Sequence, residues 1–476
     1  MREGRLLIAG QWRDSAEHRD VRNPYSGEVI GRTASATAED AAEAVEAARR
    51  GHLDGAPPQH VRAEILDRAR ALVLDRHEDL ARTIAEESGK PLKTARTEAA
   101  RCADTLRFAA TETRTLAGAV VPMDASAAGA GKLGFTLLSP RGVVAAITPF
   151  NFPLNLVCHK LAPAFAAGCP VILKPASDTP FSGLALAGIL VEAGMPPGFL
   201  SVLTGDSSVV GPAVTEPDAV QVISFTGSTD VGQRLARDNP GKRVLLELGS
   251  NAPVIVDKSA DLARAATRLA QTGFSHAGQS CISAQRIYVH RDVKDAFLDA
   301  LLREVGALVT GDPLDEHVDV GPLIRPEDRD RVLDWIREAV DGGATVRIGG
   351  EVNPDGTLQP TVLDDVTPNM KVSAEEVFGP VLAVQAVNDL DEAIRLSNAS
   401  RYGLHAGIFT ADLDAALRAA RELDFGGVLV NDSPTFRADQ MPYGGVRDSG
   451  NTREGPAWAI RDYLDEKIVV VQLPEA

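Results

Sequence analysis

Cys281 is the residue whose surroundings in this sequence point most directly to chemistry. It lies in the stretch FSHAGQSCISAQRI, between a helix-like run over residues 261–274 and a β-like run over residues 282–290. Gly278 and Gln279 predict a turn just before the sulfur, and such a turn can hold a side chain at the rim of a cleft. A cysteine thiolate at that place is a strong nucleophile toward a carbonyl carbon. The alternative is a small buried hydrophobic residue, as most lone cysteines are.

Two further polar residues could serve such a reaction. Glu247 lies at the end of an apolar strand in LLELG, where partial burial would raise the pKa of its carboxyl and suit it to general-base catalysis. Asn151, in TPFNFP, could donate an amide N–H to a developing oxyanion. Each has an ordinary alternative, which is an exposed surface carboxylate for Glu247 and a helix N-cap for Asn151.

Lys174 and residues 225–232 are candidates for binding a phosphorylated ligand. Lys174 ends the strand-like VILKP, where its ammonium could hydrogen-bond a ribose or a phosphate, or simply extend into solvent. The stretch FTGSTDVG follows a strand-like run and opens a helix-like one, so its N–H groups could receive a phosphate. It is not the G-x-G-x-x-G fingerprint, and by itself it can be an ordinary turn.

Strand-like and helix-like runs alternate from Gly142 onward and predict how these residues come together. The apolar strand-like runs are typical of a doubly wound parallel sheet, whose ligand crevice lies at the carboxyl ends of its strands. The candidate residues follow such strand ends: Thr148–Asn151, Lys174, Thr226–Ser228 and Glu247. Elsewhere the patterns predict helices over 38–50, 61–88 and 97–116, a strand over 132–139, and a second α/β segment over 251–427.

Composition excludes several classes of protein. The 476 residues, 44% hydrophobic and 24% charged, predict two or three globular domains. A net charge of −17 argues against a surface that binds nucleic acid or an anionic membrane. The four cysteines form no C-x-x-C pair, so we expect neither a disulfide framework nor a thiol-bound metal. Because no signal peptide or long apolar segment is evident, we expect a cytoplasmic protein with reduced thiols.

The C-terminal stretch DYLDEKIVVVQL predicts a long apolar strand with no partner nearby in sequence. An unpaired strand of this kind favours association with another chain. We therefore expect addition to a neighbouring subunit's sheet, in a homodimer or a homotetramer.

Taken together, the motifs resemble the aldehyde dehydrogenase superfamily over nearly the whole chain. They occur in the family's order: TPFNFPLN, LKPA, FTGS, LELG, GQSC, EEVFGP and MPYGGVRDSG. The resemblance implies an α/β fold with a Rossmann-type NAD(P)-binding domain over residues 1–123 and 140–248. It further implies a catalytic domain over 249–450 and a small β oligomerisation arm over 124–139 and 451–476.

The resemblance also implies roles for individual residues. Cys281 would be the nucleophile, Glu247 the general base and Asn151 the oxyanion donor in NAD(P)-dependent oxidation of an aldehyde, through a thiohemiacetal and a thioester, to the carboxylic acid. No metal is implied. The implied cofactor-binding residues are Ile147, Thr148, Pro149, Phe150, Lys174, Ser177, Gly211, Phe225, Gly227, Ser228, Leu248, Glu376 and Phe378.

Four positions bear on the substrate. Arg107 matches the position of an arginine that grips the substrate anion in the phosphorylated and phosphonate members, and Arg437, in the loop before the last motif, is a second candidate. A guanidinium can bond two oxygens of one anion. Each arginine could instead form a surface or interdomain ion pair. Members that act on phosphates and phosphonates carry an arginine where this chain has Ser280, and the phosphonate type has a histidine where it has Phe152. We therefore expect a short aldehyde with a single charge or a hydroxyl group.

Ser177 and Glu247 bear on the cofactor and on the fate of the thioester. Many NAD-preferring relatives have a glutamate at Ser177, and its absence removes a charge that would repel a 2′-phosphate, so we expect NADP to be tolerated alongside NAD. Two alternatives remain, which are a CoA-acylating semialdehyde dehydrogenase and a catalytically silent binding protein with the same fold. Glu247 disfavours the first, because acylating members commonly lack this base.

Overall fold

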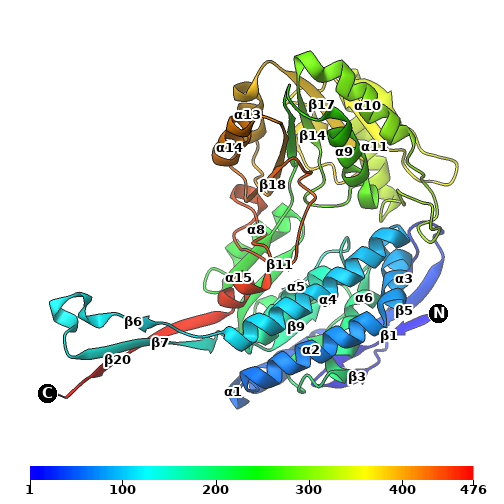
Figure 1. Ribbon diagram of the computed structural model, residues 1–476. Helices are drawn as coiled ribbons and strands as arrows, with labels where there is room; N and C mark the ends of the chain where they lie inside the picture. Colours follow the sequence, from blue (N-terminus) through cyan, green and yellow to red (C-terminus); the bar gives the residue numbers. More distant parts are fainter. Residues whose placement is uncertain (475–476) are drawn as a thin grey trace.

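Two seven-stranded sheets, each covered by helices, a small N-terminal sheet and a projecting arm make up residues 1–474, the part that this computed structural model describes (Figure 1). No helix within this part is both long and apolar enough to cross a membrane. A separate three-stranded sheet lies near the N-terminus, and it consists of β1 (Arg2–Gly4), β5 (Val29–Ala34) and β4 (His18–Arg22).

The first large sheet contains the predicted doubly wound core. Its strands follow the order β12 (Arg243–Glu247), β11 (Val220–Thr226), β8 (Val143–Ile147), β9 (Val171–Lys174), β10 (Leu200–Val202), β2 (Leu6–Ile8) and β3 (Gln11–Arg13). The first five strands are parallel, as expected, whereas β2 and β3 form an antiparallel hairpin that adds to one edge through β2. The carboxyl ends of β8, β9, β11 and β12 therefore lie along one edge, where the site forms.

Successive residues of β8 enter two different cores, because side chains alternate across a strand. Val144 and Ala146 pack into one core, and Val143 and Ala145 into the other. The helices of the first core are α2 (Gln59–Asp75), α3 (His77–Ser88), α4 (Leu92–Thr115), α5 (Asn155–Ala167) and α6 (Pro180–Glu192). The second core holds α1 (Ala38–Asp54) and α7 (Ser207–Thr215), and α8 (Thr229–Asp238) packs beside β11 and β12.

The single helix expected over 61–88 is wrong, because the chain breaks at Arg76. Its backbone (φ −101°, ψ 20°) ends α2 and starts α3. The N–H of Arg76 bonds to the Leu72 carbonyl, and its own carbonyl accepts the N–H of Leu80, so both helix ends are satisfied across the break. Apolar residues continue at helical spacing through this point, and the periodicity therefore conceals the change of direction.

The second large sheet is also mainly parallel. Its strands follow the order β15 (Thr345–Ile348), β16 (Thr361–Asp364), β17 (Val381–Val387), β14 (Arg286–His290), β13 (Pro253–Val256), β18 (His405–Phe409) and β19 (Gly427–Val430), with β15 antiparallel. The helices α9 (Leu262–Gly273), α10 (Lys294–Gly306), α11 (Pro326–Asp341) and α12 (Lys371–Ala374) pack on one face, and α13 (Leu390–Asn398) and α14 (Leu413–Glu422) on the other. The β-like run expected over 282–290 forms a strand only from Arg286.

The arm projects from the body as an antiparallel ribbon of β20 (Leu464–Gln472), β7 (Lys132–Pro140) and β6 (Val120–Val121) (Figure 1). The C-terminal strand has no partner nearby in sequence, as expected, but it does have one within its own chain, because β20 pairs with β7 along its whole length. The partner lies more than 300 residues earlier, where local sequence cannot show it. The helix α15 (Pro456–Asp462), just before β20, packs into the first body beside α5.

Candidate active site

Cys281 lies where two cavities meet, in the loop between the short 3₁₀ turn Ser275–Gly278 and β14. The larger cavity, about 820 Å³, runs along the carboxyl ends of the first sheet. The smaller, about 200 Å³, lies between α4, α5 and the loops of the second sheet. The residues that line both cavities are Leu156, Thr226, Glu247, Leu248 and Cys281.

The loop that carries Cys281 is tightly constrained. His276 and Ala277 adopt left-handed backbone angles (φ 49° and 53°), which are rare for residues other than glycine and cluster at functional sites. Gly278 is also left-handed (φ 72°), and a Cβ there would lie 2.1 Å from the Gly379 carbonyl oxygen. Gln279 anchors the loop, because its side chain accepts the N–H of Ile324 at 2.9 Å. The sulfur is therefore presented from a rigid turn.

Burial keeps the Cys281 thiol protonated at rest. It raises the pKa of the thiol to about 12, while a hydrogen bond with the Tyr443 hydroxyl, with Sγ and Oη 2.9 Å apart, opposes part of this rise. In the described chain all four cysteines are free, and Cys102, Cys158 and Cys169 are buried. Only Cys281 is partly exposed, so it is the cysteine that a ligand in the cavities can reach.

Glu247 ends β12 and faces both cavities. It is 3% exposed, and neither of its carboxylate oxygens has a hydrogen-bond partner among residues 1–474. Burial, reinforced by the nearby negative charge of Glu454, raises the pKa of the Glu247 carboxyl well above its usual value. A carboxyl group with a raised pKa that faces the nucleophile can take up a proton as a general base.

Asn151 is tied to the loop of the nucleophile. Its Nδ2 donates to the Gln279 carbonyl oxygen at 2.8 Å, while its Oδ1 has no partner in the described chain. The helix-cap alternative is wrong, because α5 begins only at Asn155 and Leu154 is its N-cap residue. An amide group carries two hydrogens, so one remains for an oxygen bound beside Cys281.

The larger cavity is lined by all thirteen residues that the sequence assigned to cofactor binding. Lys174, at the end of β9, is buried, and its ammonium donates to the Ser177 Oγ at 3.1 Å. Burial lowers the pKa of Lys174 to about 8, so the ammonium still carries most of its charge at neutral pH. Ser228 precedes α8, and N–H groups at a helix start are a site for phosphate. These features fit a dinucleotide.

Glu376 and Phe378 both line the larger cavity, and the charge of Glu376 acts on the Cys281 thiol. The Glu376 carboxylate accepts the N–H of Ser250 at 2.9 Å, and a Cβ on Gly249 would lie only 2.4 Å from its Oε2. Burial raises the pKa of Glu376 to about 7. The ring of Phe378 meets that of Phe150 edge to face, with centroids 5.8 Å apart. This packing gives the larger cavity an aromatic wall.

The smaller cavity is rich in charged groups that are already paired. Lys90 and Glu98, both 1% exposed, form an ion pair, and the Lys90 ammonium lies 3.6 Å from the centre of the Phe152 ring. The Arg437 guanidinium bonds to the Glu454 carboxylate at 3.0 Å. Several other polar atoms that line the cavity have no partner within residues 1–474: Ser280 Oγ, Thr226 Oγ1, Arg437 Nε and both ring nitrogens of His276. A polar ligand can satisfy these atoms.

Three of the four predicted substrate residues line this cavity, namely Phe152, Ser280 and Arg437. Arg107 does not line either cavity in the described structure. It is half-exposed and pairs with Asp104 at 3.0 Å. Instead, Arg101 lines the cavity from the same helix. The two arginines are six residues apart, which turns them by about 240° around the α4 axis.

Sequence reasoning also missed the polar face of α4 and three residues of the surrounding loops. Thr94, Thr97, Glu98 and Arg101 follow helical spacing and all line the small cavity, so this spacing is a signal that could have revealed them. His276 and Tyr443 sit within motifs that the sequence singled out, and Glu454 follows the last of these motifs, but no local pattern shows which of their side chains face inward.

The fold and the paired cavities define an α/β protein with a cysteine nucleophile placed between a dinucleotide-sized and a small polar cavity. The chain belongs to the aldehyde dehydrogenase family, whose model matches residues 12–469. It is an oxidoreductase of class EC 1.2.1.- with NAD(P)+ as the acceptor, and the family and fold predictions are confirmed.

Relatives with assigned names match almost the whole chain. A 3-sulfolactaldehyde dehydrogenase of Priestia megaterium is 44% identical over 470 residues, 98% of each chain. A lactaldehyde dehydrogenase of Methanocaldococcus jannaschii is 38% identical, over 98% of this chain and 100% of the relative. A Bacillus halodurans NADP-dependent glyceraldehyde-3-phosphate dehydrogenase structure with NADP has a TM-score of 0.96 at 34% identity, over 100% of both chains. Solved relatives bind NAD+ or NADP.

Proposed function

We propose that this protein oxidises a short aldehyde bearing a single anionic group or a hydroxyl group to the carboxylic acid, through a thiohemiacetal and a thioester on Cys281. The observation that carries the proposal is the position of Cys281 at the junction of the two cavities, beside the buried Glu247. A substrate carbonyl in the small cavity and a dinucleotide in the large cavity would then both lie next to the Cys281 sulfur.

The groups of the chain divide the reaction between them. The Cys281 thiol first releases its proton to solvent in the cavity. The resulting thiolate attacks the carbonyl carbon, and the Asn151 amide with the Cys281 backbone N–H stabilises the oxyanion. NAD(P)+ supplies the hydride acceptor. Glu247 then takes a proton from water as the water attacks the thioester, and the C–S bond breaks with its electron pair returning to Sγ.

The polar lining of the small cavity supports a polar substrate. Buried polar atoms without partners are costly, so Ser280 Oγ, Arg437 Nε and the His276 ring favour a ligand with oxygens of its own. The volume of about 200 Å³ suits a molecule of a few carbon atoms. The names of the relatives fit such substrates: 3-sulfolactaldehyde carries a sulfonate and a hydroxyl group, and lactaldehyde a hydroxyl group.

For the cofactor we propose that NADP+ is accepted as well as NAD+. Ser177 lies beside the Lys174 ammonium and adds no negative charge that would repel a 2′-phosphate. Specificity constants for both cofactors with one aldehyde test this, and use of NAD+ alone would contradict it.

One panel experiment tests the activity and its rivals. Purified enzyme is mixed with propanal, lactaldehyde, succinate semialdehyde and 3-sulfolactaldehyde, with either cofactor and with or without CoA, and NAD(P)H is followed by absorbance. The proposal predicts the highest kcat/KM for a polar aldehyde, with no need for CoA. Activity that requires CoA would indicate the acylating alternative, and no NAD(P)H formation with any aldehyde would indicate a silent protein.

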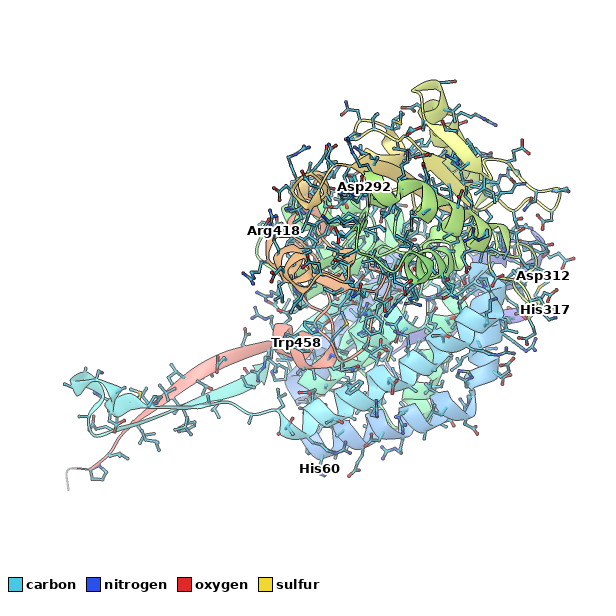
Figure 2. All side chains as sticks on the ribbon, turned by 45° about the horizontal axis from the view of Figure 1, so that its top comes forward. His60, Asp292, Asp312, His317, Arg418 and Trp458 are labelled. Carbon is cyan, nitrogen blue, oxygen red and sulfur yellow. The ribbon has the colours of Figure 1, made fainter. Side chains whose placement is uncertain are left out.

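We also propose that the arm joins subunits into a homodimer or homotetramer in the cytoplasm. The paired strands β7 and β20 leave apolar side chains exposed: Leu133, Leu137, Ile468, Val470 and Val471. Figure 2 shows the arm's side chains standing away from the body, with the half-exposed Trp458 labelled where the arm begins. Light scattering on the native protein and on an Ile468→Lys variant tests this, and a wild-type monomer would contradict it.

A further inference from the structure

The hydroxyl group of Tyr443 is the polar group in contact with the nucleophile. It lies 2.9 Å from the Cys281 Sγ. Tyr443 belongs to the loop after β19, and its side chain is 3% exposed in the small cavity. None of the steps assigned above to Cys281, Glu247 and Asn151 uses this hydroxyl.

The surroundings of Tyr443 hold its ring firmly in place. The backbone pairs with Glu454, whose carbonyl accepts the N–H of Tyr443 at 3.0 Å. The Arg437 guanidinium stacks over the ring, 3.8 Å from its centre, and is itself bonded to the Glu454 carboxylate. The His405 ring meets Tyr443 edge to face, with centroids 5.0 Å apart. Because two side chains pack against the ring and the backbone is paired, the hydroxyl has little freedom to leave the sulfur.

We propose that Tyr443 is a catalytic residue that donates a hydrogen bond to the Cys281 thiolate, both before attack on the aldehyde and when the thiolate leaves. In the neutral thiol either group can donate to the other, but a thiolate has no hydrogen, so only the phenol can donate once the proton is lost. When the last tetrahedral adduct collapses, the C–S bond breaks, its electron pair stays on Sγ, and the Tyr443 O–H bonds to it. The inference rests on the proposed role of Cys281.

The other charged groups near the sulfur do not by themselves stabilise the thiolate, so a hydrogen-bond donor is needed. Glu247 and Glu376 both raise the pKa of the thiol, and Arg437 lowers it. Burial lowers the pKa of His405 to about 4, so this ring is neutral near pH 7 and brings no positive charge. The pKa of Tyr443 itself is raised well above its usual value, mainly by burial, so its hydroxyl keeps its proton.

The smaller cavity brings further ionisable groups near the phenol. Lys90 and Glu98 compensate each other as an ion pair. The pKa of His276 is lowered well below its usual value by burial and by the Lys90 charge, so this ring is also neutral. Tyr443 is therefore the neutral donor that contacts the anionic sulfur directly.

The pH dependence of alkylation tests this role without any aldehyde. Iodoacetamide reacts with thiolates, so its second-order rate against pH reports ionisation of Cys281. A hydrogen bond to a charged group changes an equilibrium by about ten- to hundredfold, so Tyr443→Phe should move the midpoint to higher pH by about one to two units. Because the wild-type pKa is already about 12, this shift is measured as a roughly ten- to hundredfold lower alkylation rate at each pH between 7 and 9. Peptide mapping, with Cys281→Ala as the blank, confirms that Cys281 is the residue modified.

Tyr288→Phe is the matched control, because it also removes a buried hydroxyl but one bonded to Arg286 in the second sheet, away from the sulfur. Its midpoint should equal that of the wild type, and NAD(P)H binding should be unchanged in both variants. The proposal is overturned if the midpoint for Tyr443→Phe equals that of the wild type. It is also overturned if the midpoint for Tyr288→Phe shifts by as much as that for Tyr443→Phe.

A second variant covers the case in which Tyr443→Phe does not fold. Replacing Tyr443 by 3-fluorotyrosine keeps the ring and makes the phenol a stronger donor, so the midpoint should shift to lower pH. An unchanged midpoint for this variant would also overturn the proposal. The proposed function is tested separately, and it fails if Cys281→Ala still oxidises aldehydes. The alkylation of the Tyr443 variants is measured without aldehyde, so its result does not depend on that test.

Discussion

The Asn151 amide donates to the carbonyl oxygen of Gln279, two residues before the nucleophile, with Nδ2 and O 2.8 Å apart. This bond joins the end of the first sheet to the loop of the second, so the oxyanion donor and the sulfur are held in register. Preorganised donors of this kind need no rearrangement during the reaction.

Asn151→Ala should lower kcat by about 100- to 1000-fold, the usual cost of losing one oxyanion donor. Binding of NAD(P)H, followed by fluorescence, should stay close to that of the wild type, because the cofactor cavity keeps its other contacts. Asn388→Ala serves as the control, since its amide bonds only to Glu392 at the surface and turnover should not change. Wild-type turnover in Asn151→Ala would remove this residue from the mechanism.

Glu247→Gln should stabilise the protein at alkaline pH and not at acidic pH. The folded state holds the proton of Glu247 more tightly than the unfolded state, because burial raises the pKa of its carboxyl. Stability is therefore lost as pH rises above the ordinary value of a glutamate, and the loss continues up to the raised pKa. Thermal melts should show a higher Tm for Glu247→Gln at pH 8 and equal values near pH 4. If the Tm of Glu247→Gln differs from that of the wild type by the same amount at pH 8 and at pH 4, the account of a buried charge at Glu247 is contradicted.

Arg101 and Arg107 offer a matched pair on one helix. Arg101→Ala should reduce kcat/KM for a sulfonated or carboxylated aldehyde by about tenfold or more, because it removes a cation from the cavity wall and its bonds to Asp439. Arg107→Ala should change kcat/KM by less than about twofold, since an exposed ion pair contributes little. Steady-state kinetics with an anionic and a neutral aldehyde separate the two. An equal loss of kcat/KM in Arg101→Ala and Arg107→Ala would contradict the assignment of Arg101 to substrate binding.

Ser177→Glu should shift the cofactor preference of the enzyme toward NAD+. A carboxylate about 4 Å from a 2′-phosphate is repelled strongly enough to lower kcat/KM for NADP+ by about tenfold or more, while NAD+ lacks that phosphate. Ser177→Ala, which adds no charge, should keep NADP+ activity. Specificity constants for both cofactors give the answer, and undiminished NADP+ use by Ser177→Glu would show that the 2′-position lies elsewhere.

Much of this fold could be predicted because its signals are local. The apolar runs that end at Ile147, Lys174 and Glu247 form parallel strands as expected, and the motifs at their ends all reach the larger cavity. Strand alternation and short turns act over a few residues, so a single sequence displays them.

The features that escaped prediction depend on packing between distant segments. The break at Arg76 interrupts no periodicity, and the partner of β20 lies far away in the chain. The resemblance pointed to Arg107, but Arg101 of the same helix lines the cavity, because the position around the helix axis decides which side chain faces it. Tyr443 was part of a recognised motif, yet its contact with Cys281 exists only in three dimensions.

The most direct test of the central claim is to trap the acyl-enzyme on Cys281. Glu247→Gln is mixed with NAD(P)+ and its best aldehyde, quenched in acid, and analysed by intact-mass and peptide mass spectrometry. We expect a burst of about one NAD(P)H per active site, because general-base catalysis contributes about 100- to 10,000-fold to hydrolysis. The same sample should carry the mass of the acyl group on the Cys281 peptide. Turnover without this adduct, or an adduct on Cys102, Cys158 or Cys169, would contradict the account.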